Sequence, residues 1–177
     1  MARRNKAGFS LLELMVTVSI AAILISLGIP AFQNYALKQR LNAAINALHN
    51  DLLMARSQAI HRDMQVIACP LKAQSGCTEK TDWSEGWIVF GDSNEDGNFQ
   101  EGESILRHGQ KVENVMIHST AGRTHFRFYS NGTAPGSNGS ISLCGLGGPF
   151  MARKLVISNL GRVRREMAKS LDEAYCP

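Results

Sequence analysis

The stretch GFSLLELMVTVSIAAILISLGIPAF, residues 8–32, decides the fold of this 177-residue chain. From Phe9 onward it carries a single charged side chain, Glu13. About 20 apolar residues in a helix span a hydrocarbon core of roughly 30 Å, so residues 9–32 predict a transmembrane segment. A carboxylate in such a segment costs about 2.5–3.5 kcal/mol on insertion scales. We therefore expect Glu13 to be neutralised by a partner.

The residues before this stretch are short and basic. Arg3, Arg4 and Lys6 account for most of the net charge of +4, so a chain cut after Gly8 is nearly neutral. The basicity is thus confined to the N-terminus and does not indicate a nucleic-acid-binding composition. Basic residues before an apolar span predict a cytoplasmic N-terminus and an external remainder. No small-residue cleavage site follows residue 32, so we expect the apolar segment to be retained.

Apolar residues continue at helical spacing beyond the apolar segment. They recur three or four positions apart, which is the period of one helix face: Leu37, Leu41, Ile45, Leu48, Leu52, Ala55 and Ala59. Residues 33–62 therefore predict an amphipathic continuation of the same helix. Gly28 and Pro30 predict a kink or local melting near the membrane boundary.

After residue 62 the pattern changes to short apolar runs separated by turn signals. The candidate strands are Met64–Cys69, Gly86–Phe90, Ser104–Arg107, Val115–Ser119, His125–Tyr129, Ser140–Cys144 and Lys154–Ser158. A series of short strands after one helix predicts an α+β fold, with an antiparallel sheet covering the apolar stripe of the helix. Residues 63–177 are expected to form this β-rich head.

Four cysteines lie in the predicted head: Cys69, Cys77, Cys144 and Cys176. Outside the membrane the environment is oxidising, so we expect them to form disulfides. Four cysteines allow three pairings, and the sequence does not choose among them. Cys69–Cys77 would close a short loop, and Cys144–Cys176 would then hold the C-terminal tail. A zinc site is the alternative, but no CxxC motif occurs.

The segment around Gly8, Phe9 and Glu13 resembles the class III leader of type IV pilins and type II secretion pseudopilins. The resemblance implies the type IV pilin fold and a leader, residues 1–8, that a prepilin peptidase removes between Gly8 and Phe9. It also implies N-methylation of the new amine of Phe9. In the assembled filament, Glu13 is implied to pair with the N-terminal amine of a neighbouring subunit. An ordinary signal anchor with a stray acid is the alternative.

The stretch GWIVFGDSNEDGNFQEGESIL, residues 86–106, resembles the head of the FimT/FimU/GspH group of minor pilins and pseudopilins, and GRVR at residues 161–164 fits the same group. The resemblance implies a minor subunit in the priming or tip complex of a type IV pilus. Its implied partners are other pilins, the prepilin peptidase and the inner membrane, with a periplasmic head before assembly. A minor pseudopilin of type II secretion, without DNA binding, is the alternative.

Arg162, Arg164 and Arg165 offer several cations to a phosphate backbone. They resemble the GRxR motif of FimT-like pilins that is implicated in DNA binding during natural transformation. In a strand, Arg162 and Arg164 would face one side and Arg165 the other. No aromatic residue is interleaved, so binding to double-stranded DNA is expected to be sequence-independent and salt-sensitive. A solvated basic strand followed by Glu166 is the alternative.

Asp92, Asn94, Asp96, Gly97 and Glu103 match the spacing of a calcium-binding loop. Strands rather than helices are expected on both sides, so a hairpin turn is favoured, with no metal or cofactor. Enzymatic motifs are missing from the sequence: the five histidines form no HExxH, and GxSxG is absent. We therefore expect a non-enzymatic subunit.

Overall fold

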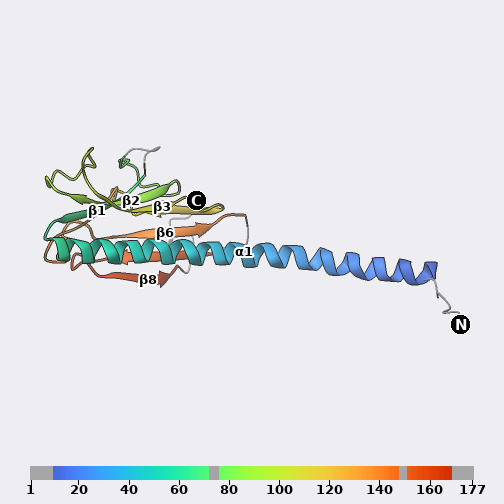
Figure 1. Ribbon diagram of the computed structural model, residues 1–177. Coiled ribbons are helices and arrows are strands. Elements are labelled where there is room, and N and C mark those ends of the chain that lie inside the picture. The colour runs from blue at the N-terminus through green and yellow to red at the C-terminus, as the bar shows by residue number, and fades with distance from the viewer. Residues whose placement is uncertain (1–9, 72–75, 148–150, 169–177) are drawn as a thin grey trace, which may run out of the picture. The chain divides into compact units, whose positions relative to one another are not determined.

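The structure is a computed structural model that describes residues 10–71, 76–147 and 151–168. Gly8, Phe9 and Cys176 lie outside the described residues. The described chain forms one helix followed by strands (Figure 1). The elements are α1 (Leu11–Arg62), β1 (Gln65–Pro70), β2 (Gly86–Asp92), β3 (Ile105–Gln110), β4 (Val115–Ser119), β5 (Phe126–Phe128), β6 (Gly139–Gly145), β7 (Ala152–Ile157) and β8 (Val163–Met167).

Local signals set both ends of α1. The Leu14 amide donates to the Ser10 carbonyl at 3.1 Å, so Ser10 takes the N-cap position, where serine is favoured. At the other end Asp63 adopts a left-handed conformation (φ 49°), and the Met64 amide donates back to Ala59. This hydrogen bond closes the helix in a Schellman-type cap. Between these caps, α1 stays helical through Pro30, so the helix does not melt there; the kink stays a prediction.

The chain divides into two compact units, residues 1–36 and residues 37–177. In the first unit the described residues up to Tyr35 are exposed helix. Within α1, a window near the N-terminus is long and apolar enough to cross a membrane, by length and composition alone. A signal sequence near an N-terminus has the same length and apolar composition.

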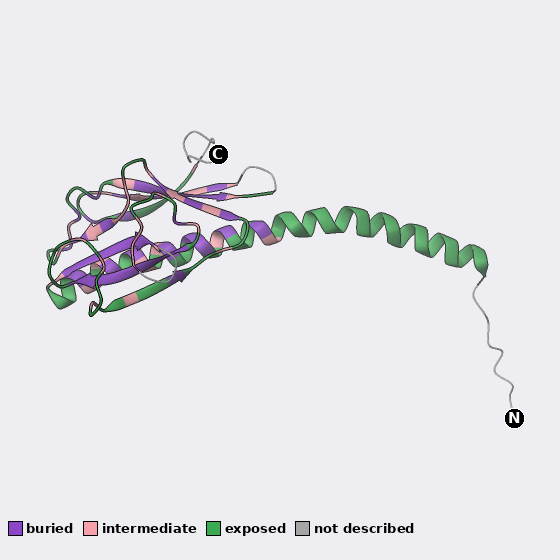
Figure 2. Ribbon diagram, turned by 90° about the horizontal axis from the view of Figure 1, so that it is seen from above, coloured by how far each residue is buried: buried purple, intermediate pink, exposed green. Residues whose placement is uncertain are grey.

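In the second unit, α1 buries one face and exposes the other (Figure 2). The buried residues are Leu37, Leu41, Ala44, Ile45, Leu48, Leu52, Ala55 and Ala59. All seven members of the stripe expected from the sequence are among them. The helical period therefore identified the face that packs against the head.

The strands form two four-stranded antiparallel sheets, where the sequence predicted one sheet. The first has the order β3-β2-β1-β5, and the second has the order β4-β6-β7-β8. They separate because β5 returns to pair with β1, with Val66 opposite Phe128, whereas β4 pairs forward with β6. The α1 stripe and residues of both sheets share one hydrophobic core that includes Trp83 and Trp87.

The apolar pattern did not identify β8, although a basic strand at the arginines was one of the alternatives. Strand β8 pairs with β7, with Arg164 opposite Val156, and only Val163 of its five residues is buried. A charged edge strand lacks the apolar alternation that identifies half-buried strands. Gly161 adopts a left-handed conformation (φ 72°) in the β7–β8 turn, where an added Cβ would collide with the Gly132 carbonyl.

A smaller core lies on the other face of the first sheet. It consists of Ile67, Cys69, Ile88 and Phe90, with Leu71, Cys77 and Phe99 packed against it. Phe99 belongs to the β2–β3 loop, and its ring meets that of Phe90 edge-on at a centroid distance of 5.3 Å. The β2–β3 loop is therefore folded onto the sheet.

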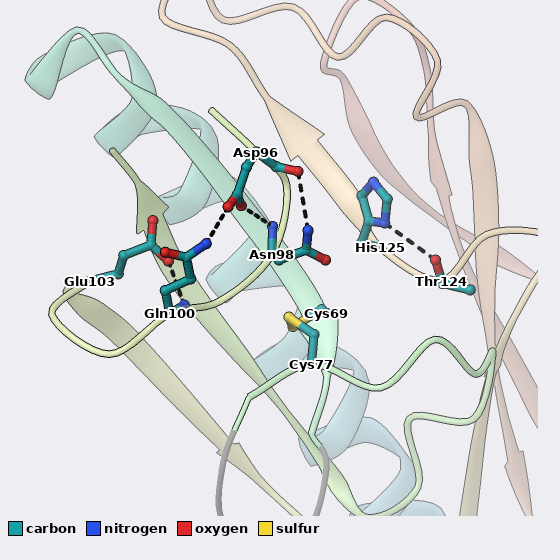
Figure 3. The surroundings of a disulfide bond; sticks show 8 residues. All are labelled: Cys69, Cys77, Asp96, Asn98, Gln100, Glu103, Thr124 and His125. Carbon is teal, nitrogen blue, oxygen red and sulfur yellow. Dashed lines mark hydrogen bonds between the residues drawn. A yellow bond between two sulfur atoms is a disulfide. The ribbon is translucent and has the colours of Figure 1, made fainter. Parts of the chain in front are cut away.

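The structure confirms one disulfide, Cys69–Cys77, with Cα atoms 5.5 Å apart (Figure 3). It ties the segment after β1 to the small core. Cys144 is also disulfide-bonded. The pairing of Cys144 with Cys176 stays a prediction, because Cys176 lies outside the described residues.

Candidate functional site

Glu13 lies in the first turn of α1, where the positive end of the helix dipole favours a carboxylate. The hydroxyls of Thr17, Ser19 and Ser26 donate to carbonyls three or four residues earlier, at 2.8–2.9 Å, so they are satisfied inside the helix. Glu13 forms no ion pair with any described residue. Its carboxylate is therefore the charge that an apolar environment would leave uncompensated.

The surface around Glu13 is apolar. The exposed large side chains are Leu11, Leu12, Leu14, Met15, Val16, Val18, Ile20, Ile23, Leu24, Ile25, Leu27, Ile29, Phe32 and Tyr35. Soluble monomers rarely expose contiguous apolar patches of this extent, because burying such surface is favourable. A lipid bilayer or neighbouring apolar helices would cover this surface.

The head is joined to α1 by a hydrogen bond that the sequence did not reveal. The indole Nε1 of the buried Trp87 donates to Asp51 Oδ2 at 2.8 Å, and Asp51 Oδ1 lies 3.8 Å from the Nε of Arg107. Gly109, on the neighbouring strand, lies against the Trp87 ring, and an added Cβ would collide with it. The GW pair of the sequence motif is thus an element of the core.

The β2–β3 loop forms a hairpin connection, as the sequence favoured, since β2 and β3 pair antiparallel. Gly97 provides the left-handed conformation (φ 84°), and its amide donates to Asp92 Oδ2 at 3.0 Å. Glu103 accepts from the amides of Ser93 (3.1 Å) and Gln100 (2.9 Å). In the described part of the chain, no three His, Cys, Asp or Glu side chains are arranged as metal ligands.

The three C-terminal arginines do not form a single cationic surface. Arg164 and Arg165 point to opposite faces of β8, as the sequence indicated. Arg164 Nε lies 2.6 Å from Glu166 Oε1 in an ion pair. Arg165 instead donates to Asn46 Oδ1 of α1 at 2.6 Å. Arg162 is exposed just before β8 and forms no ion pair among the described residues.

A shallow groove lies on the outer face of the second sheet, beside Arg164. It is lined by Thr120, Asn138, Gly139, Ser140, Lys154, Val156, Ile157, Ser158, Asn159, Arg164 and Glu166. Lys154 and Arg164 give the groove two cations, which Glu166 partly offsets. The groove can attract an anion by charge, but it offers no aromatic ring for stacking on a base.

His125 and Cys77 of the disulfide line the same pocket (Figure 3). The pKa of His125 is lowered by burial and by the nearby charges of Arg127 and Arg123, which favour the neutral imidazole. Its Nδ1 lies 3.3 Å from the hydroxyl of Thr124, an interaction that either atom could donate. Gly97 also lines this pocket. The cysteine sulfurs here are bonded to each other, so they supply no free thiolate nucleophile.

Comparison with known proteins identifies the head and the N-terminus separately. Residues 44–161, more than half of the chain, match the family described as type II transport protein GspH. Residues 3–29 match the prokaryotic N-terminal methylation motif. A 37-residue segment is 59% identical to prepilin peptidase-dependent protein D of Escherichia coli K12. That segment covers 21% of this chain and only 25% of the relative.

Solved structures share the fold. The type IV minor pilin FimU of Pseudomonas aeruginosa superposes with a TM-score of 0.61 at 23% identity, over 77% of this chain and 98% of that chain. The minor pseudopilin EpsH of the Vibrio cholerae type 2 secretion system gives a TM-score of 0.54 at 10% identity, over 74% and 99%. The pilin fold expected from the sequence is confirmed. With its methylation motif, its long helix and its two-sheet head, the chain belongs to the GspH family.

Proposed function

We propose that this chain is a minor pilin that assembles through α1 into the priming or tip complex of a type IV pilus. The observation that carries the proposal is Glu13, a carboxylate with no ion pair among the described residues, which lies at the start of an exposed apolar helix four residues after Phe9. Cleavage between Gly8 and Phe9 would create an amine at Phe9. The exposed apolar surface of α1 suits packing against other subunits, so we take the amine of a neighbouring subunit as the partner of Glu13.

The proposal separates membrane insertion from assembly. Removing a carboxylate from an apolar segment lowers the cost of insertion. Removing one partner of a desolvated ion pair, however, leaves the other charge uncompensated. Glu13→Ala should therefore leave the membrane-inserted pool unchanged or larger, while the amount in sheared filaments falls by roughly tenfold or more. Thr17→Ala, one turn away with a self-satisfied hydroxyl, is the matched control and should assemble normally.

Mass spectrometry of the N-terminus gives an independent test. A mature chain that begins with N-methylated Phe9 supports processing by a prepilin peptidase. An intact Met1 start together with normal filament levels of Glu13→Ala would reject the proposal in favour of a simple signal anchor.

The alternative host is a type II secretion pseudopilus, which the description of the matching family supports. Deletion of the gene separates the two machines. Loss of surface pili with normal enzyme secretion supports the pilus, whereas loss of secretion with normal piliation supports the pseudopilus.

We also propose that the β7–β8 hairpin binds duplex DNA without sequence preference. The supporting observations are the exposed Arg162, which has no ion pair among the described residues, and the shared groove of Lys154 and Arg164. Arg162→Gln combined with Arg164→Gln should weaken binding and reduce the salt slope by about one to two counterions. Arg165→Gln is the control, because Arg165 is held by Asn46. Equal affinity of the double variant and the wild type would reject this function.

A further inference from the structure

The β2–β3 loop carries oxygen atoms at every ligand position of a twelve-residue calcium loop. The positions are Asp92 (1), Asn94 (3), Asp96 (5), the backbone carbonyl of Asn98 (7), Gln100 (9) and Glu103 (12), with Gly97 at the sharp bend (6). We call residues 92–103 the acidic loop. It contains five carboxylates and no lysine or arginine. None of these carboxylates forms an ion pair with a described residue.

Asp92 provides an observation that is independent of this spacing. Its side chain is fully buried at the end of β2. One oxygen, Oδ2, accepts from the Gly97 amide, which directs the carboxylate into the acidic loop. The other oxygen, Oδ1, is buried and has no hydrogen-bond partner among the described residues. A buried carboxylate oxygen without a partner is costly, and a cation beside it removes that cost.

The Asp96 carboxylate accepts hydrogen bonds from side-chain amides that are able to rotate. Asn94 Nδ2 (3.0 Å) and Gln100 Nε2 both donate to Asp96 Oδ2, so two amide donors surround one carboxylate oxygen. Rotating each amide by half a turn presents its oxygen in place of its nitrogen. Figure 3 shows Gln100 between Asp96 and Glu103, with hydrogen bonds to both.

Glu103 is placed to close such a site. Its two oxygens accept from the amides of Ser93 and Gln100, so it folds back from position 12 to the beginning of the loop. A bidentate carboxylate is the ligand that calcium takes from this position. The carboxylates do not yet surround a metal in the present arrangement, so binding requires the amides to turn and Glu103 to release its backbone bonds.

We propose that the acidic loop binds one Ca²⁺ ion. Six to eight oxygen ligands in a flexible loop suit Ca²⁺, whereas Mg²⁺ requires a strict octahedron and keeps its waters. Bound calcium would fix the loop that holds Phe99 against Phe90 over the small core. The site thus links extracellular calcium to the stability of the head, independently of which machine the subunit joins.

Calorimetric titration of the calcium-depleted full chain in detergent micelles tests the proposal, together with thermal unfolding followed by tryptophan fluorescence. We expect saturable binding with a Kd on the order of 10⁻⁴–10⁻³ M, as in extracellular calcium modules. A hundredfold excess of Ca²⁺ over the Kd should raise Tm by about 5–10 °C. An equal rise with Mg²⁺ at the same ionic strength, or no saturable heat at millimolar Ca²⁺, would overturn the proposal.

Two variants of exposed loop carboxylates separate ligation from general charge. Asp96→Ala removes the ligand at position 5 and should weaken binding by roughly tenfold or more. Glu101→Ala removes a carboxylate from a non-ligand position and should change the Kd by no more than about twofold. Equal weakening in both variants would overturn the proposal. If Asp96→Ala does not fold, as judged by near-ultraviolet circular dichroism, Glu103→Gln takes its place with the same expectations.

Discussion

The indole Nε1 of Trp87 donates a 2.8 Å hydrogen bond to Asp51 Oδ2, joining the first sheet to the helix across 36 residues of sequence. Trp87 is buried, so its N–H has no access to water. Asp51 is partly exposed and keeps its second oxygen toward Arg107. A hydrogen bond to a charged group contributes about 1.5–3 kcal/mol, more than one between neutral groups.

Asp51→Ala should lower the free energy of unfolding by about 1–3 kcal/mol, because the buried Trp87 N–H loses its acceptor. Asp51→Asn keeps an acceptor oxygen and should cost less. Urea unfolding followed by tryptophan fluorescence measures both. Asp63→Asn is the control, since Asp63 is exposed in a left-handed conformation that Asn tolerates. An Asp51→Ala variant as stable as the control would show that the hydrogen bond does not hold the helix.

Gly109→Ala should destabilise the head by about 1–3 kcal/mol, because the added Cβ collides with the buried Trp87 ring. His108→Ala, at the preceding exposed position of β3, provides the comparison. Urea unfolding measures the loss of unfolding free energy in each variant, and a larger loss for Gly109→Ala indicates close packing against Trp87. Similar stabilities for the two variants would contradict the predicted clash.

Replacing both Cys69 and Cys77 by alanine should lower the free energy of unfolding by about 2–3 kcal/mol, from the closure entropy of the short loop. Genetic replacement is preferable to a reductant, because Cys144 is also disulfide-bonded. Thermal unfolding of the double variant measures the loss. A Tm equal to that of the wild type would mean that the packing around Phe90 alone holds this segment.

Acidification should destabilise the head through His125. Burial, then Arg127 and Arg123, lowers its pKa below the ordinary value of 6.5, so the unfolded chain binds the proton first as the pH falls. The stability contribution is present above about pH 6.5 and is lost as the pH falls through the lowered pKa. His125→Asn should flatten this part of the profile of unfolding free energy against pH. An unchanged slope between pH 7 and pH 5 would show that another group controls it.

The long helix and its buried face could be predicted because they depend on local periodicity. A residue such as Leu48 shares a face with Leu41 and Leu52 whatever the head looks like. Strand β8 could not be identified in this way, since at an exposed edge only Val163 is buried. The sequence left three connectivities of the four cysteines open. In the structure Cys69 and Cys77 are bonded, with their Cα atoms 5.5 Å apart.

The sequence by itself determined the apolar N-terminal segment, the buried stripe of the helix and the order of most strands. These features follow from hydrophobicity, spacing and turn chemistry within short windows of sequence. Tertiary structure decided the division into two sheets, because β5 had to choose a partner some 60 residues away. It also decided the partner of Arg165, which donates to Asn46 Oδ1 of α1, 119 residues away in the sequence. Contacts between distant residues depend on how the elements pack, and no local pattern records them.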